Sequence, residues 1–328
     1  MSVRPVAGPL GERRMKLALI GASGLLGRAV AAALVPRRDW QLLATVREPG
    51  SAHALAAARI AGLDPAALTP LDVLDAGALD RFFAAQRPDA VIVCAAERRP
   101  DVCERDPAAA RALNVDAPAA IAARAEALGA WTLAMSTDYV FDGSAPPYRE
   151  TDAPSPLNAY GRGKADGEAA LLAASSRACA LRLPLLYGPV IDWADSAVTS
   201  LVPAIVASSR DGAAPVEMDA WATRYPTWTP DVAEVIVQLA ERHAAGAAVT
   251  GLCQWSGDEP MNKHEIATRI AAALDIVPRL IAVADPKDAT PRPRDCHLDS
   301  SRLEALGIGR RTRFDEAIRA VLRDGPAR

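Results

Sequence analysis

The sequence predicts an α/β protein: a doubly wound parallel sheet followed by a smaller C-terminal α/β lobe. Two observations lead to this fold class. From Lys16 onward, short apolar runs alternate with alanine-rich helical stretches, the pattern of a parallel sheet covered by helices on both faces. After Tyr187 this rhythm changes, and helices mix with short strands. We therefore expect one large sheet domain and a second, smaller lobe.

The strands of the sheet domain are expected in six apolar runs. Their nearly continuous apolar character suits strands that helices cover on both sides. A helix should follow the first strand from about Gly24, and another should run between the fourth and fifth strands, where Asp106 can cap its start, Pro107 suits its first position and Gly129 can end it. The six expected strands are 16–20, 40–46, 68–75, 89–96, 130–137 and 178–188.

The domain boundaries follow from the change of rhythm. Residues 1–14 are expected to form a flexible tail, because the fold starts near Met15. Residues 15–187 should form the sheet domain, with 224–245 packing back on it, and residues 188–223 and 246–328 should form the lobe. After Tyr187 the expected elements are helices at 196–209, 230–243, 261–274 and 315–324, and strands at 215–218 and 250–254.

Composition and charge exclude several classes of function. Half of the 328 residues are apolar, which is enough for a large core. The net charge of −3 and the scattered Lys and Arg residues offer no basic surface to nucleic acid. No apolar run approaches the roughly 20 residues that cross a bilayer, and the first residues lack the apolar stretch of a signal peptide. We expect a cytoplasmic protein with neither a nucleic-acid nor a membrane partner.

The spacing of the cysteines and histidines predicts no metal site. The five cysteines are widely spread and contain no CxxC pair, so they are expected to be reduced thiols in the core. The four histidines lie far apart in the sequence and make no ligand pattern.

A glycine-rich turn follows the first strand directly. The segment GASGLLG spaces its glycines three residues apart, between a strand and a helix. In this setting glycines let the backbone approach a pyrophosphate at the N-terminus of the helix, where free N–H groups favour negative charge. The segment therefore predicts a dinucleotide site of the Rossmann type. Its expected contacts are Gly21, Ser23, Gly24, Leu25, Leu26 and Gly27.

The end of the second strand indicates which dinucleotide is bound. Arg47 stands about where a cation would favour the 2′-phosphate of NADP, whereas a carboxylate there would favour NAD. We therefore predict NADP(H) in preference to NAD(H), although Glu48 keeps NAD open. Further cofactor contacts are expected at Asp72 and Val73 after the third strand, and at Ala95 and Ala96 after the fourth. The alternative role of Asp72 is to cap a turn at the surface.

The segment NAYGRGKADGE places a phenol and an ammonium on one face of a helix. Tyr160 and Lys164 are four residues apart, so both side chains should point the same way. Glycine is unfavourable inside a helix, so the glycines at 161, 163 and 167 are expected to keep this face open to a ligand.

A hydroxyl at the end of the fifth strand completes a catalytic set. Thr137 should lie at the carboxyl edge of the sheet, which is the ligand side of an open parallel sheet. Reduction of a ketone needs a proton donor, and Tyr160 can serve if Lys164 lowers its pKa. Thr137 would hold the carbonyl oxygen, and Lys164 would also orient the ribose of the cofactor.

These motifs resemble a known family. GASGLLG, STDYVFDG and YGRGK together resemble the extended short-chain dehydrogenase/reductase family and, within it, the dTDP-4-dehydrorhamnose reductase branch, for which STDYVFDG is distinctive. Longer stretches, among them CAAERRPDVCE, LNVDAP and RPRDCHLDSSRLEALGIG, resemble the regulatory (beta) subunit of methionine adenosyltransferase. The similarity runs from about Met15 to about Phe314.

The two resemblances imply different functions. Similarity to the reductases implies NADPH-dependent reduction of a nucleotide-linked 4-keto-6-deoxy sugar by Thr137, Tyr160 and Lys164, and it leaves a homodimer open. Similarity to the regulatory subunit implies that the same pocket binds NADP while the protein forms a complex with methionine adenosyltransferase. The intact catalytic set makes the reductase the preferred prediction, although AAERRPD departs from the AAYTAVD type of stretch in the sugar reductases.

Four arginines are candidates for binding an anionic substrate. Arg98 and Arg99 follow the fourth strand, with the alternative that they are surface or interface charges. Arg224 lies among Trp221, Tyr225 and Trp228, where core packing is the alternative role of the two tryptophans. Arg292 lies on a proline-stiffened loop.

Overall fold

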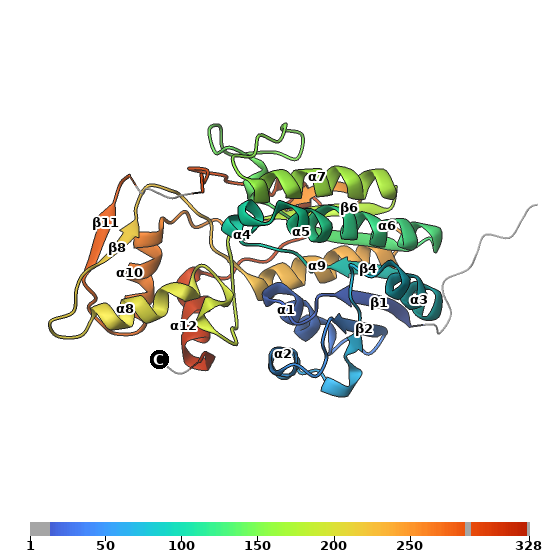
Figure 1. The fold of residues 1–328 in the computed structure, drawn as a ribbon, viewed down its shortest axis with the longest axis horizontal. Coiled ribbons are helices and arrows are strands. Elements are labelled where there is room, and N and C mark those ends of the chain that lie inside the picture. The colour runs from blue at the N-terminus through green and yellow to red at the C-terminus, as the bar shows by residue number, and fades with distance from the viewer. Residues whose placement is uncertain (1–13, 286–289, 327–328) are drawn as a thin grey trace, which may run out of the picture.

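A seven-stranded parallel sheet lies between two layers of helices in the computed structural model, which describes residues 14–285 and 290–326 (Figure 1). The predicted α/β class is confirmed. Residues 1–13, nearly all of the predicted tail, lie outside the described residues. In spatial order the strands are β10 (Gly251–Gln254), β6 (Ala178–Leu183), β5 (Trp131–Thr137), β4 (Ala90–Val93), β1 (Met15–Ile20), β2 (Trp40–Val46) and β3 (Thr69–Pro70).

Alternate residues of each strand pack on opposite faces of this sheet. Leu17 and Leu19 of β1 belong to the core on one face, and Ala18 and Ile20 to the core on the other. All four are almost completely buried, so the apolar run in the sequence reflects a strand covered on both sides. One face packs α1 (Leu25–Leu34), α2 (Ala52–Ala61) and α9 (Thr229–Ala244), and the other packs α3 (Ala76–Gln86), α6 (Ala117–Ala127) and α7 (Ala159–Ala174).

The helix predicted between the fourth and fifth strands is divided. Asp106 accepts a hydrogen bond from Ala109 N at 3.0 Å and caps the helix start, and Pro107 occupies the first position, as predicted. One wide π-helical turn then interrupts the helix before α6, and Gly129 follows its end with a φ of 75°. The segments are α4 (Pro100–Arg105), α5 (Pro107–Arg111), η2 (Ala112–Asp116) and α6.

Three predicted strands are shorter than expected. The fourth, β4, already stops at Val93. The third strand stops at Pro70, and the Asp72 carboxylate accepts a hydrogen bond from Leu74 N at 2.9 Å, which turns the chain toward α3. The sixth stops before Pro184, which has no N–H for a sheet ladder. Beyond it, β7 (Leu186–Tyr187) pairs with β9 (Thr227–Trp228) instead.

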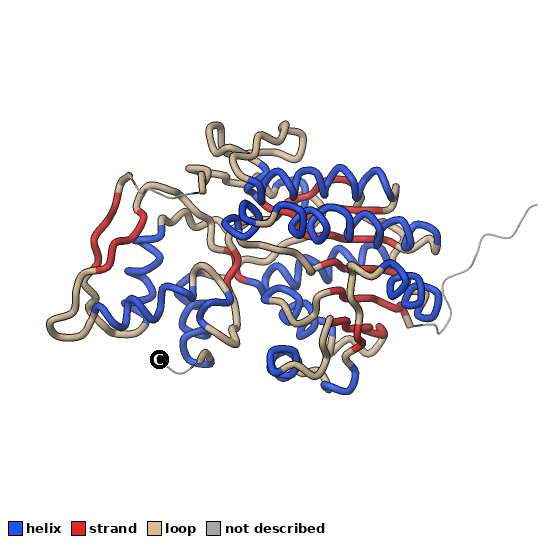
Figure 2. The backbone as a smooth tube through the Cα atoms, viewed as in Figure 1, coloured by secondary structure: helices blue, strands red, loops and turns tan. Residues whose placement is uncertain are grey.

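The second lobe has a core of its own, which includes Ile205, Ile270 and Ile318. Its short strands β8 and β11 lie at the end farthest from the main sheet (Figure 2). The elements of the lobe are α8 (Val202–Ser208), β8 (Val216–Asp219), α10 (Lys263–Ala273), β11 (Leu280–Val283) and α12 (Phe314–Asp324). The remaining short helices are η1 (Pro65–Ala67), η3 (Asp138–Val140), η4 (Trp193–Asp195), η5 (Thr199–Leu201) and α11 (Ser301–Glu304).

One strand lies in a different unit from the one expected. Residues 246–328 were assigned to the lobe, but β10 pairs with β6 in the main sheet, with Gly251 opposite Cys179. The four residues of β10 do not specify which sheet the strand joins, because pairing depends on distant residues. In the same unit, α9 packs against α1, and both helices contribute to the core of one sheet face.

The glycines of α7 serve the fold rather than a ligand at two positions. A Cβ on Gly161 would lie 2.1 Å from the carbonyl oxygen of Tyr139, and one on Gly167 would lie 2.3 Å from that of Asn114. The expectation that these glycines keep a face open to a ligand is therefore wrong for 161 and 167, because protein backbone fills the space. At Gly163 an added Cβ would meet nothing within 4 Å.

This difference gives a matched pair of substitutions. Gly161→Ala is expected to lower the free energy of unfolding by about 1–3 kcal/mol, since the new methyl group must displace the backbone of η3. Gly163→Ala should raise it by up to about 1 kcal/mol, the difference in helix propensity. Urea denaturation of both variants measures these changes, and a stabilised Gly161→Ala would contradict the packing argument.

Candidate functional site

A cavity of about 430 Å³ opens at the carboxyl edge of the main sheet, where the lobe faces it. Its wall combines the glycine turn, the ends of β4, β5 and β6, the first turns of α7 and three segments of the lobe. The sheet thus places its ligand side where the topology predicts it. The predicted site residues that line the cavity are Gly24, Leu25, Leu26, Ala96, Arg98, Arg99, Thr137, Tyr160, Lys164, Arg224 and Arg292.

The rest of the glycine turn lies behind this wall. Gly21 has a φ of +84°, and a Cβ there would lie 2.7 Å from Ala95 N, so only glycine fits between β1 and β4. Its N–H donates to Thr45 O at 3.2 Å, which ties the turn to the end of β2. Ser23 O lies 3.2 Å from Nε2 of His53 at the start of α2. Gly27 is buried in the first turns of α1.

Three predicted cofactor residues lie at the same sheet edge but outside the cavity lining. Arg47 is exposed just beyond β2, and its only described ionic partner is Glu48 at 3.9 Å. Asp72 is exposed and caps its own turn, which is the alternative role given to it above. Val73 is half-buried against the core below α3.

Thr137 lies at the centre of a small hydrogen-bond network. Its hydroxyl donates to Asp138 Oδ1 at 3.1 Å and accepts from Tyr139 N at 3.2 Å, which caps η3. It is also hydrogen-bonded to the phenol of Tyr160. The end of β5 and the first turn of α7 therefore bring together two of the three predicted catalytic groups.

Burial controls the titration of this site. Burial raises the pKa of Tyr160 above its ordinary value, and the bond with Thr137 only partly offsets this. Burial also lowers the pKa of Lys164 to about 8, and the Glu168 carboxylate, one helical turn further on, opposes that shift. A lowered pKa of Tyr160 is not seen in this structure, because desolvation of the phenol outweighs the hydrogen bond with Thr137, and the effect of Lys164 on it stays a prediction.

A buried ion pair supports the floor of the cavity. The two carboxylate oxygens of Glu168 accept from Arg182 Nε at 2.9 Å and Nη2 at 2.8 Å. The Ser136 hydroxyl, from a residue that lines the cavity, also donates to Glu168. Sequence reasoning missed Glu168, although its place four residues after Lys164 puts both on one helix face.

The end of the cavity toward the lobe is rich in arginine. Arg99 pairs with Glu97 at 2.7 Å and Arg292 lies 3.8 Å from Asp101, so two of the guanidinium groups already have a carboxylate partner. Arg98 makes a long hydrogen bond of 3.4 Å to the Ala194 carbonyl. Together with Lys164 and Arg224, these residues give the lining more cations than carboxylates. This end of the cavity can hold an anionic ligand.

Arg224 is the one member of its aromatic segment that lines the cavity. It donates to Pro293 O at 2.9 Å and lies 5.7 Å from the ring of Tyr139. Tyr225 is instead stacked on His297 at 4.1 Å, and Trp228 packs against the core of the lobe. Core packing, the alternative role of the two tryptophans, is observed for Trp228, whereas Trp221 is 39% exposed.

Several lining residues were not predicted. Leu183 ends β6, and Pro184, Leu185 and Leu186 follow it, so the rule that ligands bind at the carboxyl ends of strands could have found them. Ser196 and Ala197 come from a loop of the lobe, and nothing in their sequence marks them. Asp138 was read as part of a family motif without a role.

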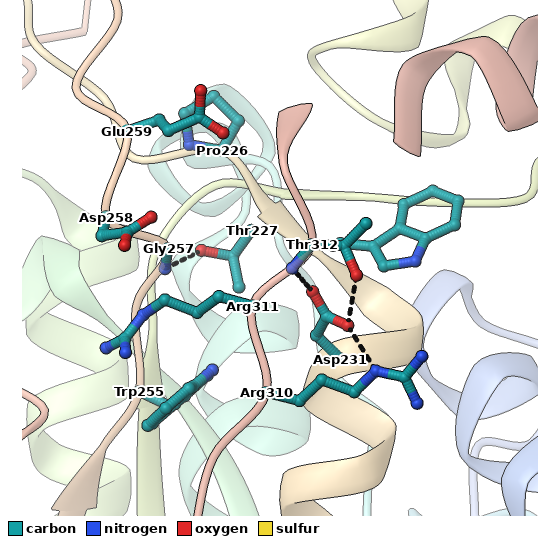
Figure 3. Close-up of a pocket in the computed structure, with 11 residues that line it drawn as sticks. Pro226, Thr227, Asp231, Trp255, Gly257, Asp258, Glu259, Arg310, Arg311 and Thr312 are labelled. Atoms are coloured by element: carbon teal, nitrogen blue, oxygen red, sulfur yellow. Dashed lines mark hydrogen bonds and ion pairs between the residues drawn. The ribbon is translucent and has the colours of Figure 1, made fainter. Parts of the chain in front are cut away.

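A second cavity, of about 10 Å³, lies beside β9 and the start of α9 (Figure 3). Asp231 accepts there from Thr312 N at 2.6 Å and from Thr312 Oγ1 at 2.9 Å, and Arg311 lies 4.2 Å from the Trp255 ring centre. This volume holds about one water molecule, so it is no candidate for a cofactor site.

The described residues contain neither a metal-binding cluster nor a membrane-spanning helix. Within residues 14–285 and 290–326, no three His, Cys, Asp or Glu side chains are grouped so that they could hold a metal ion. No helix in these same ranges has the length and apolar character needed to cross a membrane.

Comparison with known proteins agrees with this architecture. The family model of the RmlD substrate-binding domain matches residues 15–325. Methionine adenosyltransferase 2 subunit beta of Xenopus tropicalis is 40% identical over 306 residues, 93% of this chain and 86% of that protein. A dTDP-4-dehydrorhamnose reductase of Streptomyces griseus is 30% identical over 303 residues, 90% of this chain and 89% of that protein.

A solved structure shares the whole fold. The crystal structure of dTDP-4-dehydrorhamnose reductase from Bacillus anthracis in complex with NADP superposes with a TM-score of 0.78 at 20% identity, and the match covers 96% of this chain and 100% of that one. Both resemblances noted from the sequence motifs are confirmed at the level of the family.

Proposed function

Because the chain belongs to the RmlD substrate-binding-domain family of the extended short-chain dehydrogenase/reductases, we propose that it binds NADP(H) and serves as a regulatory subunit of a methionine adenosyltransferase. The observation that carries this proposal is the 40% identity to a methionine adenosyltransferase 2 subunit beta over 93% of the chain. The dTDP-4-dehydrorhamnose reductase is less similar, at 30%. The relatives therefore favour the function that the sequence motifs placed second.

Co-expression with the methionine adenosyltransferase of the same organism tests the proposal. We expect the two chains to purify as a complex and the kinetics of S-adenosylmethionine synthesis to change on binding. The Streptomyces griseus reductase, which is a family relative, is the matched control and should not bind. A failure to form any complex, with unchanged kinetics, would overturn the proposal.

A second function, reduction of a ketone, is favoured by the contents of the cavity. Thr137, Tyr160 and Lys164 line one wall, and Thr137 is hydrogen-bonded to Tyr160. Bound NADPH would supply a hydride. Tyr160 would hold the carbonyl oxygen and protonate the resulting alkoxide, Thr137 would orient the phenol, and the arginine-rich end would hold the diphosphate of a nucleotide-linked 4-keto-6-deoxy sugar. A partner would bind to the outer surface, so the two functions are compatible.

Oxidation of NADPH in the presence of freshly generated dTDP-4-dehydrorhamnose tests this second function. Wild-type protein should turn over, and Tyr160→Phe should not, because it lacks the proton donor but keeps the ring. Tight binding of NADPH without turnover of this sugar would reject the reductase and leave the regulatory function standing.

The choice between the two nicotinamide cofactors can be tested at Arg47. We expect Arg47→Ala to weaken NADPH binding about tenfold, since a hydrogen bond to a charged group contributes on the order of 1.5 kcal/mol. NADH binding should not change, because NADH lacks the 2′-phosphate. Arg38→Ala is the matched control, since Arg38 is an exposed arginine that precedes β2, at the opposite edge of the sheet. Equal losses with both cofactors would contradict the role of Arg47.

A further inference from the structure

The Thr137 hydroxyl has three hydrogen-bond partners but only one proton to donate. It donates to Asp138 Oδ1, accepts from Tyr139 N and is hydrogen-bonded to the phenol of Tyr160. A hydroxyl carries one proton and two lone pairs. While the Asp138 carboxylate takes the one proton, Thr137 can only accept from Tyr160. The phenol proton then points at Thr137 and not into the cavity.

Protonation of Asp138 reverses these bonds. The carboxylic acid can now donate to Thr137 Oγ1, which still accepts from Tyr139 N and has its own proton free. Thr137 then donates to the phenol oxygen, and the phenol proton of Tyr160 is free to face a ligand. The state of one carboxyl group therefore decides which way two hydrogen bonds point.

We propose that Asp138 is a positioning residue that acts through Thr137, so that protons pass from Asp138 to Thr137 to Tyr160 during reduction. The proposal rests on the reductase function of the cavity. NADPH gives a hydride to the carbonyl carbon and Tyr160 gives its proton to the oxygen. Tyr160 regains a proton from Thr137, and Thr137 regains one from the Asp138 carboxyl. Asp138 is left as a carboxylate and takes a proton from solvent, so the net reaction consumes one ketone, one NADPH and one proton.

The surroundings of Asp138 allow both protonation states near neutral pH. The residue is only 6% exposed. Burial raises its pKa to about 7, while Arg224 and the hydrogen bond from Thr137 oppose the shift. The other titratable groups that face Asp138 are the phenols of Tyr139 and Tyr160 and the thiol of Cys296. Since the protonated form is the productive one, activity should fall as the pH rises through neutrality.

The pH dependence of kcat/KM for dTDP-4-dehydrorhamnose tests the proposal. For wild type we expect a fall of about tenfold per pH unit on the alkaline side. Asp138→Asn should lose this fall and keep only a low activity that does not change with pH, because its amide donates a hydrogen bond to Thr137 at every pH but cannot pass on a proton. Asp142→Asn is the matched control: the pKa of Asp142 is about 2, so this carboxylate is ionised throughout and its loss should leave the midpoint in place.

The outcomes separate the proposal from the function on which it rests. If wild type reduces the sugar and Asp138→Asn keeps the same alkaline fall, the relay is wrong and the reductase stands. If wild type reduces nothing, the reductase fails and the relay fails with it.

Infrared titration gives a second readout that needs no turnover. A protonated carboxyl band should titrate near neutral pH in wild type and be missing in Asp138→Asn. Thr137→Val should move its midpoint to higher pH, since the bond from Thr137 stabilises the carboxylate. An unmoved midpoint would overturn the link between Thr137 and Asp138.

Discussion

Glu168→Gln is expected to lower the free energy of unfolding by about 3–5 kcal/mol. Arg182 is fully buried and Glu168 is 6% exposed, so the pair has almost no contact with solvent. The guanidinium cannot lose its charge, and among the described residues its Nη1 already has no hydrogen-bond partner. Without the carboxylate, the cation between β6 and α7 has lost its anionic partner, and the Phe141 ring 5.0 Å away offsets its desolvation only in part.

Two controls make this prediction specific. Glu104→Gln removes the carboxylate of an exposed pair between α4 and Arg162 of α7, while its amide oxygen can still accept from Ala159 N, and it should change stability by no more than about 1 kcal/mol. The double variant Glu168→Leu, Arg182→Met removes both charges and should recover most of the loss, because apolar side chains of similar size pack well there. Urea denaturation measures all three variants. A Glu168→Gln loss no larger than that of Glu104→Gln would show that the pair is not important for folding.

The pattern of the sequence was sufficient for the sheet domain because its strands are covered on both faces. The runs at 40–46 and 130–137 match β2 and β5 within a residue, and the caps at Asp106 and Pro107 lie where their side-chain chemistry predicts. The prediction was wrong where distant residues decide the structure. The short run at 250–254 joins the main sheet through its pairing with β6, and nothing local specifies that partner.

The candidate site, too, could be predicted only in part. The residues after the strands could be predicted from topology, since every strand of a parallel sheet delivers its carboxyl end to one edge. Hydrogen-bond direction and burial could not be predicted. The orientation of the Thr137 hydroxyl depends on Asp138, and the pKa values of Tyr160 and Lys164 depend on how deeply α7 is buried. Sequence spacing contains no information on desolvation.

Lys164→Met is expected to stabilise the protein and to weaken its binding of NADPH. Burial lowers the pKa of Lys164 from 10.5 to about 8. Below pH 8 the buried ammonium therefore reduces the free energy of unfolding. The shift corresponds to a cost on the order of 3 kcal/mol, which methionine, similar in length but uncharged, does not incur. In the wild type the cost is fully present below about pH 8 and is relieved as the pH rises toward 10.5, so the gain from methionine should shrink over that window.

The loss of affinity has a separate cause, which the same variant measures. In the bound state the ammonium would donate hydrogen bonds to the ribose hydroxyls of the cofactor, and such charged bonds contribute about 1.5–3 kcal/mol, or roughly 10- to 100-fold in affinity. Unfolding at several pH values and titration by nicotinamide fluorescence follow the two effects. Lys263→Met, at the start of α10 and outside the cavity lining, should change neither. Opposite signs for stability and affinity would mean that the site keeps a costly buried charge for its ligand, whereas a loss of both would assign Lys164 to the fold.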